Sequence, residues 1–170
     1  STSPWSPFPT LPPQAASATA HVVDGDTLIA NGITFRLYGI DAPEYHQDCT
    51  NAAGQAYPCG RAARAQLEAL VLPGSVQCLV RAEDRYHRSV ATCGTSAVQD
   101  LSQAMVSAGQ AISPAERGTA PYAEEEAAAQ AAKRGIWQGP FETPALWRAA
   151  HPRLTAPTPS AHTVPNPTSR

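Results

Sequence analysis

The sequence predicts an α+β domain in which a small five-stranded β-barrel carries three α-helices. Two observations predict it. Short β-prone runs stand in two groups, before and after a first helical segment, and two more helical segments follow the second group. The expected order is therefore three strands, a helix, two strands and two helices. Short antiparallel strands interleaved with helices are typical of a barrel of the OB type.

Prolines divide the chain, because most of the 17 in its 170 residues lie near the two ends. We expect a Pro-rich N-terminal extension over residues 1–18, a folded domain over 19–150 and a Pro/Thr/Ser-rich tail over 151–170. Roughly 130 residues are enough for one domain with its own core. The ends are interpreted as linkers, or as segments that dock onto a protein partner.

The first three strands are predicted at residues 20–23, 27–30 and 33–38. Asn31-Gly32 separates the last two, and this dipeptide favours the tight hairpin turn in which both central residues have positive φ. Side chains alternate between the faces of a strand, so Arg36 is expected on the face opposite Phe35.

The remaining elements follow from apolar spacing and from turn residues. Helices are predicted at about 60–71, 100–108 and 121–135, and strands at 76–81 and 89–93. Pro73-Gly74 ends the first helix and Gly109 caps the second. The segment from Glu83 to Arg88 is interpreted as a charged turn.

Four cysteines form an even set without the short spacing of a zinc knuckle. Disulfides are favoured, with Cys49 paired to Cys59 across a loop and Cys78 to Cys93 across a strand pair. This pairing implies an oxidising compartment, periplasmic or secreted. Metal binding and free buried thiols are the alternatives. Ser1 in place of Met leads us to expect that a leader or tag has been removed.

The overall charge excludes strong whole-molecule attraction to nucleic acid, because the formal net charge is −2 and the pI is near 6.2. Positive charge is local instead. The first half of the domain holds Arg36, Arg61, Arg64, Arg81, Arg85 and Arg88. No apolar run is long enough to span a membrane.

Three acids and one arginine stand close together in the sequence, at the edges of the β runs: Asp26, Arg36, Asp41 and Glu44. Carboxylate oxygens suit a hard cation such as Ca²⁺. A guanidinium makes bidentate bonds to phosphate. The pattern predicts a site for a divalent cation and a phosphate.

Five motifs in order extend this pattern: Asp24-Gly25-Asp26-Thr27, Thr34-Phe35-Arg36-Leu37, Asp41-Ala42-Pro43-Glu44, Asp84-Arg85-Tyr86-His87-Arg88 and Gly135-Ile136-Trp137. With them, the chain from Val22 to Trp137 resembles the thermonuclease family, the staphylococcal-nuclease-like domain, and its extracytoplasmic bacterial members in particular. The resemblance implies an OB barrel with three helices. It also implies Ca²⁺-dependent hydrolysis of single-stranded or frayed DNA and RNA with little sequence specificity.

The resemblance also implies a role for each matching residue. Asp26, Asp41 and the backbone carbonyl of Ala42 would hold Ca²⁺. Glu44 would align or deprotonate the attacking water, and Arg36 and Arg88 would grip the scissile phosphate. Arg85 and Tyr86 would contact a terminal phosphate.

The chain departs from the family pattern in two places. His87 stands where a glycine is usual, which would strain a backbone of positive φ. Residues 112–116 hold none of the tyrosines that stack on the substrate base. One alternative is therefore a non-catalytic OB-type binding or accessory subunit docked through its Pro-rich ends. Another is a phosphodiesterase for a different polyanion or nucleotide.

Overall fold

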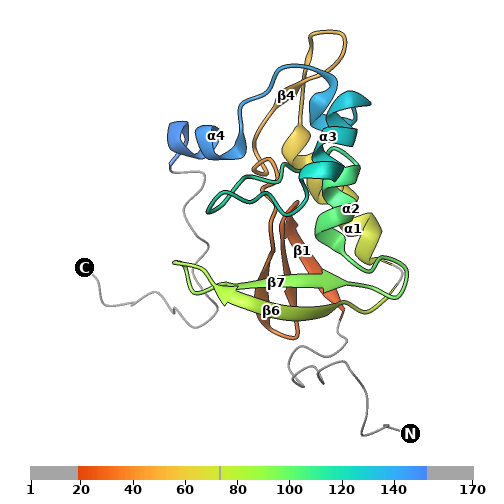
Figure 1. Cartoon of the computed structure of the whole chain (residues 1–170), viewed down its shortest axis with the longest axis vertical. Coiled ribbons are helices and arrows are strands. Elements are labelled where there is room, and N and C mark those ends of the chain that lie inside the picture. Colours follow the sequence, from red (N-terminus) through yellow and green to blue (C-terminus); the bar gives the residue numbers. More distant parts are fainter. Residues whose placement is uncertain (1–18, 73, 153–170) are drawn as a thin grey trace, which may run out of the picture.

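A five-stranded sheet forms the centre of the computed structural model, which describes residues 19–72 and 74–152. Its strands are β1 (Ala20–Asp24), β2 (Thr27–Ala30), β3 (Ile33–Leu37), β6 (Gln77–Glu83) and β7 (Ser89–Gly94). They lie in the order β1-β2-β3-β7-β6 (Figure 1). Only β3 and β7 run parallel; the other neighbours are antiparallel. The five predicted strands are thus confirmed.

The sheet is open, and the predicted closed barrel is wrong in this respect. Within the described residues, β1 and β6 are the edges, and no ladder of hydrogen bonds joins them. A barrel closes only when its first and last strands pair. Here β1 packs against the first helix and has no strand on its outer side within the described residues.

Four α-helices accompany the sheet: α1 (Cys59–Val71), α2 (Leu101–Ser107), α3 (Ala123–Ala131) and α4 (Pro144–Ala150). The first three match the predicted helices, but the predicted total of three is wrong. Helices α1, α2 and α3 gather on one side of the molecule and α4 lies apart from them (Figure 1). Pro144 lies in the first turn of α4, a position where Pro is well tolerated.

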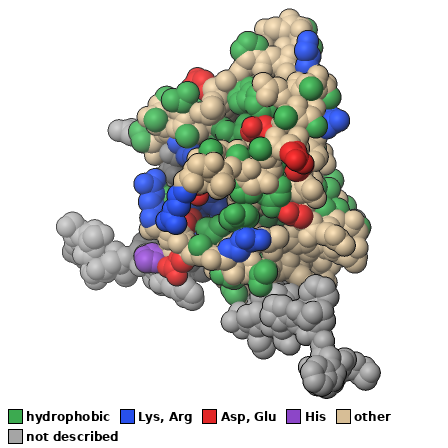
Figure 2. All heavy atoms as spheres, in the orientation of Figure 1, with side chains coloured by type: hydrophobic (Ala, Val, Ile, Leu, Met, Phe, Trp, Pro, Cys, Tyr) green, Lys and Arg blue, Asp and Glu red, His purple; other side chains and the backbone are tan. Residues whose placement is uncertain are grey.

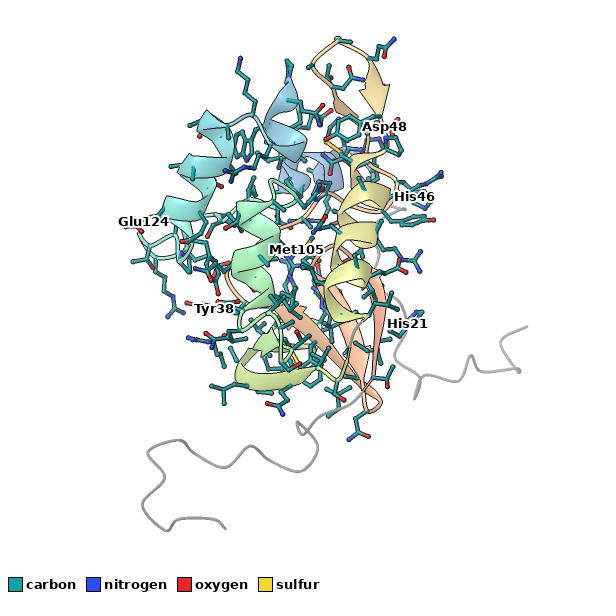
Figure 3. All side chains as sticks on the ribbon, turned by 90° about the vertical axis from the view of Figure 1, so that its right-hand side faces the viewer. His21, Tyr38, His46, Asp48, Met105 and Glu124 are labelled. Atoms are coloured by element: carbon teal, nitrogen blue, oxygen red, sulfur yellow. A yellow bond between two sulfur atoms is a disulfide. The ribbon has the colours of Figure 1, made fainter. Side chains whose placement is uncertain are left out.

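One apolar core joins the sheet to α1 and α2. Its largest fully buried side chains include Leu28, Phe35, Leu37, Leu67, Leu101 and Met105. Met105 lies in the interior, whereas His21 and His46 point outward (Figure 3). The alternation predicted for β3 is confirmed, because Phe35 and Leu37 are buried in this core while Arg36 is only partly buried.

The hairpin and both disulfides are as predicted. Asn31 and Gly32 have φ of 53° and 75°, as a tight hairpin turn requires. Cys49 is bonded to Cys59, and Cys78 to Cys93. The Cys49–Cys59 loop also contains a small sheet of β4 (Cys49–Thr50) and β5 (Ala56–Tyr57), where an irregular segment was expected.

The predicted extension (1–18) and most of the predicted tail (151–170) lie outside the described residues. Within the described part, no helix has the length and apolar character needed to cross a membrane.

Candidate active site

The turn between β1 and β2 holds the first two acids. The backbone N–H of Asp26 donates to Asp24 Oδ1 at 3.2 Å, which fixes the turn. A side chain at the intervening Gly25 would come within 2.8 Å of the Cβ atoms of Ala63 and Ala42. The turn therefore lies directly against α1 and against the segment that carries the other acids.

Asp26 and Asp41 are brought together by backbone contacts and by Arg36. Asp26 Oδ2 accepts from the N–H of Ala42 at 2.8 Å. Asp41 is held in place by a two-way backbone bridge to Ile112. Arg36 contacts Asp26 Oδ1 through Nη1 at 2.7 Å and Asp41 Oδ1 through Nη2 at 3.2 Å. Both carboxylates are buried, so this guanidinium neutralises charge that water reaches poorly.

Glu44 is held by a turn that ends at Gln47. The Glu44 N–H donates to Gln47 Oε1 at 3.1 Å, and the Gln47 N–H donates back to the Glu44 carbonyl at 2.8 Å. Gln47 is fully buried and also donates through Nε2 to the carbonyl of Glu142 at 2.8 Å. Gly60, in the first turn of α1, leaves no room for a side chain beside the Glu44 carbonyl. The backbone of Glu44 is therefore fixed from both sides.

An arginine that the sequence analysis did not select also lies in this site. Arg148 of α4 donates from Nη1 to Asp41 Oδ1 and Glu44 Oε1, both at 2.9 Å, and from Nη2 to Asp41 Oδ2 at 3.0 Å. Its carboxylate partners raise the pKa of Arg148, the hydrogen bond to Asp41 most of all. A signal for it existed: Thr143-Pro144 is a helix start, with a capping hydroxyl followed by proline.

The pKa values of the acids shift in different directions in this site. Burial alone would raise the pKa of Asp26, but the charge of Arg36 and several hydrogen bonds lower it to about 2. Burial and the charge of Asp26 raise the pKa of Glu44, against the opposing effect of Arg148. Burial and Asp26 likewise raise the pKa of Asp24. Asp26 therefore favours the ionised form, whereas burial and neighbouring negative charge favour the neutral forms of Glu44 and Asp24.

Arg88, predicted as the second phosphate-binding arginine, is engaged elsewhere. Asp84 Oδ2 accepts from Arg88 Nε at 2.7 Å, and Asp84 Oδ1 accepts from the backbone N–H of Arg88 at 2.9 Å. Within the described part of the chain, no contact joins Arg88 to the acids of the site. His87 has a φ of 63°, so the unusual residue does occupy a left-handed position.

Arg85 and Tyr86 are exposed on the same turn, which joins β6 to β7. The Arg85 guanidinium lies 4.9 Å from the centre of the Tyr86 ring and that of Arg88 lies 5.3 Å from it. Figure 2 shows Lys and Arg side chains gathered beside the tip of this hairpin. The turn thus presents two guanidiniums and one aromatic ring, with Asp84 paired to Arg88 and Glu83 to His87.

The residues of the site suit a divalent cation by chemistry and by charge. Its acids are Asp24, Asp26, Asp41 and Glu44, four oxygen-donor groups against the guanidiniums of Arg36 and Arg148, a net charge of −2 when all are ionised. Among the described residues, however, no three acids, histidines or cysteines stand ready as a metal-binding group. In this structure, Arg36 and Arg148 contact one oxygen of Asp26, both oxygens of Asp41 and one oxygen of Glu44.

Two comparisons relate the chain to known proteins. A family model described as staphylococcal nuclease homologue matches residues 34–139. The chain is also similar to the succinoglycan biosynthesis protein ExoI of Rhizobium meliloti (strain 1021), with 31% identity over 120 residues. That match covers 70% of this chain and 63% of the relative.

Proposed function

The chain belongs to the staphylococcal nuclease homologue family, and on this premise we propose that it is a Ca²⁺-dependent nuclease. It would hydrolyse phosphodiester bonds of DNA and RNA with little sequence specificity, preferring single-stranded or frayed regions. The observation that supports this most is the meeting of Arg36 with Asp26 and Asp41 beside Glu44. It joins a guanidinium fork to several oxygen donors in a partly enclosed place.

Each residue has a role that follows from its chemistry. Asp26, Asp41 and the carbonyl of Ala42 would hold Ca²⁺, which when bound supplies positive charge against the phosphate oxygens. Arg36 would bind those same oxygens more strongly as their negative charge grows in the transition state. Arg88 is the predicted second phosphate ligand, after release from Asp84. Arg85 and Tyr86 would contact a terminal phosphate.

Glu44 would act as the proton acceptor. Its raised pKa brings it closer to the pH at which a general base works well. Water oxygen attacks the phosphorus, its proton passes to Glu44, and the bond from phosphorus to the leaving oxygen breaks. The leaving oxygen then takes a proton from solvent.

The deciding experiment is degradation of denatured DNA by the full chain, with Ca²⁺ and with an excess of chelator. We expect hydrolysis only with Ca²⁺. Glu44→Gln should lower kcat by about 100-fold or more while leaving the melting temperature near that of the wild type. Hydrolysis that is unaffected by chelator, or normal turnover in Glu44→Gln, would refute the proposal.

A non-catalytic role as a binding or accessory subunit is the second candidate. One observation favours it: in this structure, arginines hold the acids that catalysis would need. The relative ExoI is also named for succinoglycan biosynthesis rather than for nuclease activity. No turnover in excess Ca²⁺, together with recovery of a partner in fixed stoichiometry, would favour this role.

The two disulfides support a place in an oxidising compartment, and we propose that the protein is periplasmic or secreted. Thiol alkylation of the protein in intact cells tests this proposal. Cysteines that label without prior reduction would contradict it.

A further inference from the structure

Helix α4 brings Arg148 to the candidate site from outside the segment that the family model matches. Thr143 Oγ1 caps the helix by accepting from the N–H of Leu146 at 3.3 Å, and Trp147 is buried. The carbonyl of Glu142, just before the helix, accepts from Gln47. Gln47 also holds the backbone of Glu44. Gln47 thus supports both the backbone of Glu44 and the start of the helix that carries Arg148.

Arg148 binds the two acids with the most direct proposed roles. Its fork takes both oxygens of Asp41, a proposed Ca²⁺ ligand, and Nη1 also reaches Glu44, the proposed base. It shares Asp41 Oδ1 with Arg36. The two guanidiniums therefore meet at one carboxylate, and both lie where a phosphate would be bound.

These contacts cannot all persist when a divalent cation is bound. A cation on Asp41 competes with Arg148 for the two oxygens of that carboxylate, and it repels the guanidinium. The side chain of Arg148 is 34% exposed, against 20% for that of Arg36, so solvent and solutes can reach it. Once displaced from Asp41 it keeps only the contact with Glu44, and a substrate phosphate beside Arg36 would offer it a second anion.

Arg88 is held more firmly away from that position. Asp84 binds both its side chain and its backbone, and the turn that carries it is separate from the acids. Arg148 needs to give up Asp41, which the cation would take, and its single contact with Glu44. It is therefore better placed than Arg88 to supply the second guanidinium.

We propose that Arg148 is an exchange arginine: it neutralises Asp41 and Glu44 when no cation is bound, and binds the substrate phosphate once a divalent cation has taken Asp41. The proposal rests on the proposed nuclease function. It predicts that loss of Arg148 changes cation binding and turnover in opposite directions. A merely structural role would not do so.

The test uses the full-length protein with two readouts. The first is Ca²⁺ affinity, measured by calorimetry without nucleic acid. The second is kcat/KM on denatured DNA at saturating Ca²⁺. Arg148→Ala should bind Ca²⁺ several-fold more tightly, because a competing positive charge is gone. Its kcat/KM should fall by about 100-fold, as for the loss of one preorganised donor.

Three further variants sharpen the test. Arg148→Lys keeps the charge but loses the fork, so its Ca²⁺ affinity should stay near wild type while kcat/KM remains low. Leu146→Ala alters an exposed position on the same helix and should change neither readout. Arg88→Ala should leave Ca²⁺ affinity unchanged. Melting temperatures identify any variant that fails to fold. If Arg148→Ala fails, Arg148→Lys is compared with wild type instead.

The outcomes separate the two proposals. If wild-type protein does not hydrolyse DNA, the proposed function fails, and the phosphate role of Arg148 fails with it. If wild type is active but Arg148→Ala binds Ca²⁺ no more tightly, only the exchange proposal is overturned. Tighter Ca²⁺ binding with undiminished kcat/KM also overturns it, because Arg148 would then be a competitor of the cation alone.

Discussion

Asp26 and Glu44 belong to one cluster of acids, yet their pKa values move in opposite directions. Arg36 and hydrogen bonds overcome the effect of burial at Asp26, whose pKa falls to about 2. At Glu44, burial and the charge of Asp26 outweigh Arg148, and the pKa rises. Asp26 therefore stays ionised at neutral pH, as a cation ligand must. Glu44 is the acid better suited to accept a proton.

The lowered pKa of Asp26 predicts a pH dependence of stability. A carboxylate with a depressed pKa in the folded state stabilises the fold above its unfolded pKa of 3.8, and this contribution is lost as pH falls toward 2. The free energy of unfolding of wild type relative to Asp26→Asn should therefore shrink by about 2 kcal/mol between pH 5 and pH 2. Urea unfolding at several pH values in the presence of chelator measures it.

Asp48→Asn serves as the control, because it removes one carboxylate at an exposed loop position. Its effect on the free energy of unfolding is subtracted from that of Asp26→Asn at each pH. A difference between wild type and Asp26→Asn that stays constant over this pH range would contradict the ion pair with Arg36.

The tight turn between β2 and β3 lets the free-energy cost of a positive φ be measured at one residue, Gly32. Gly32 has a φ of 75° and a Cβ there would meet nothing within 4 Å, so Gly32→Ala should lower stability by about 1 kcal/mol through backbone strain alone. Gly74→Ala is the matched control, since it too is in open space but without a positive φ. Thermal unfolding of both variants makes the comparison, and equal melting temperatures would contradict it.

At the scale of elements, local patterns were enough where neighbours in sequence are also neighbours in space. Asn31-Gly32 determines the hairpin, and alternation in β3 places Arg36 opposite the core. Arg148 was missed because it lies 107 residues from Asp41, on a seven-residue helix whose position depends on Gln47 and Trp147. Closure of the sheet was mispredicted for the same reason, since it depends on how distant edges pack.

The packing of α1 against the Glu44 turn predicts an effect at a distance from the acids. A Cβ on Gly60 would overlap the carbonyl of Glu44, so Gly60→Ala must displace either the helix or the turn. We expect a loss of about 2 kcal/mol in stability and a lower kcat, because Glu44 would be misplaced. Chemical unfolding and initial rates measure the two effects. Gly74→Ala again serves as control, and an unaltered kcat in Gly60→Ala would show that the Glu44 backbone tolerates movement.

For the whole molecule, the distribution of charge matters more than its sum. The net charge of −2 gives no general attraction for nucleic acid. Arg85 and Arg88 adjoin Tyr86 at the turn between β6 and β7, where Asp84 pairs with Arg88. The candidate site instead holds four acids against two arginines. A bound polyanion should therefore meet Arg85 at the hairpin tip and be repelled by the acids of the site until a cation is present.

This arrangement predicts weak binding of single-stranded DNA with a modest dependence on salt. In chelator, where hydrolysis is not expected, the logarithm of the affinity should fall with that of salt concentration by roughly 0.7 per phosphate contacted. Arg85→Gln should reduce the slope by about one such contact. Lys133→Gln, which removes an exposed charge after α3, should leave it unchanged. Fluorescence anisotropy of a labelled oligonucleotide measures these slopes. Equal slopes for Arg85→Gln and wild type would mean that the tip does not bind the backbone, and the terminal-phosphate role of Arg85 would be lost with it.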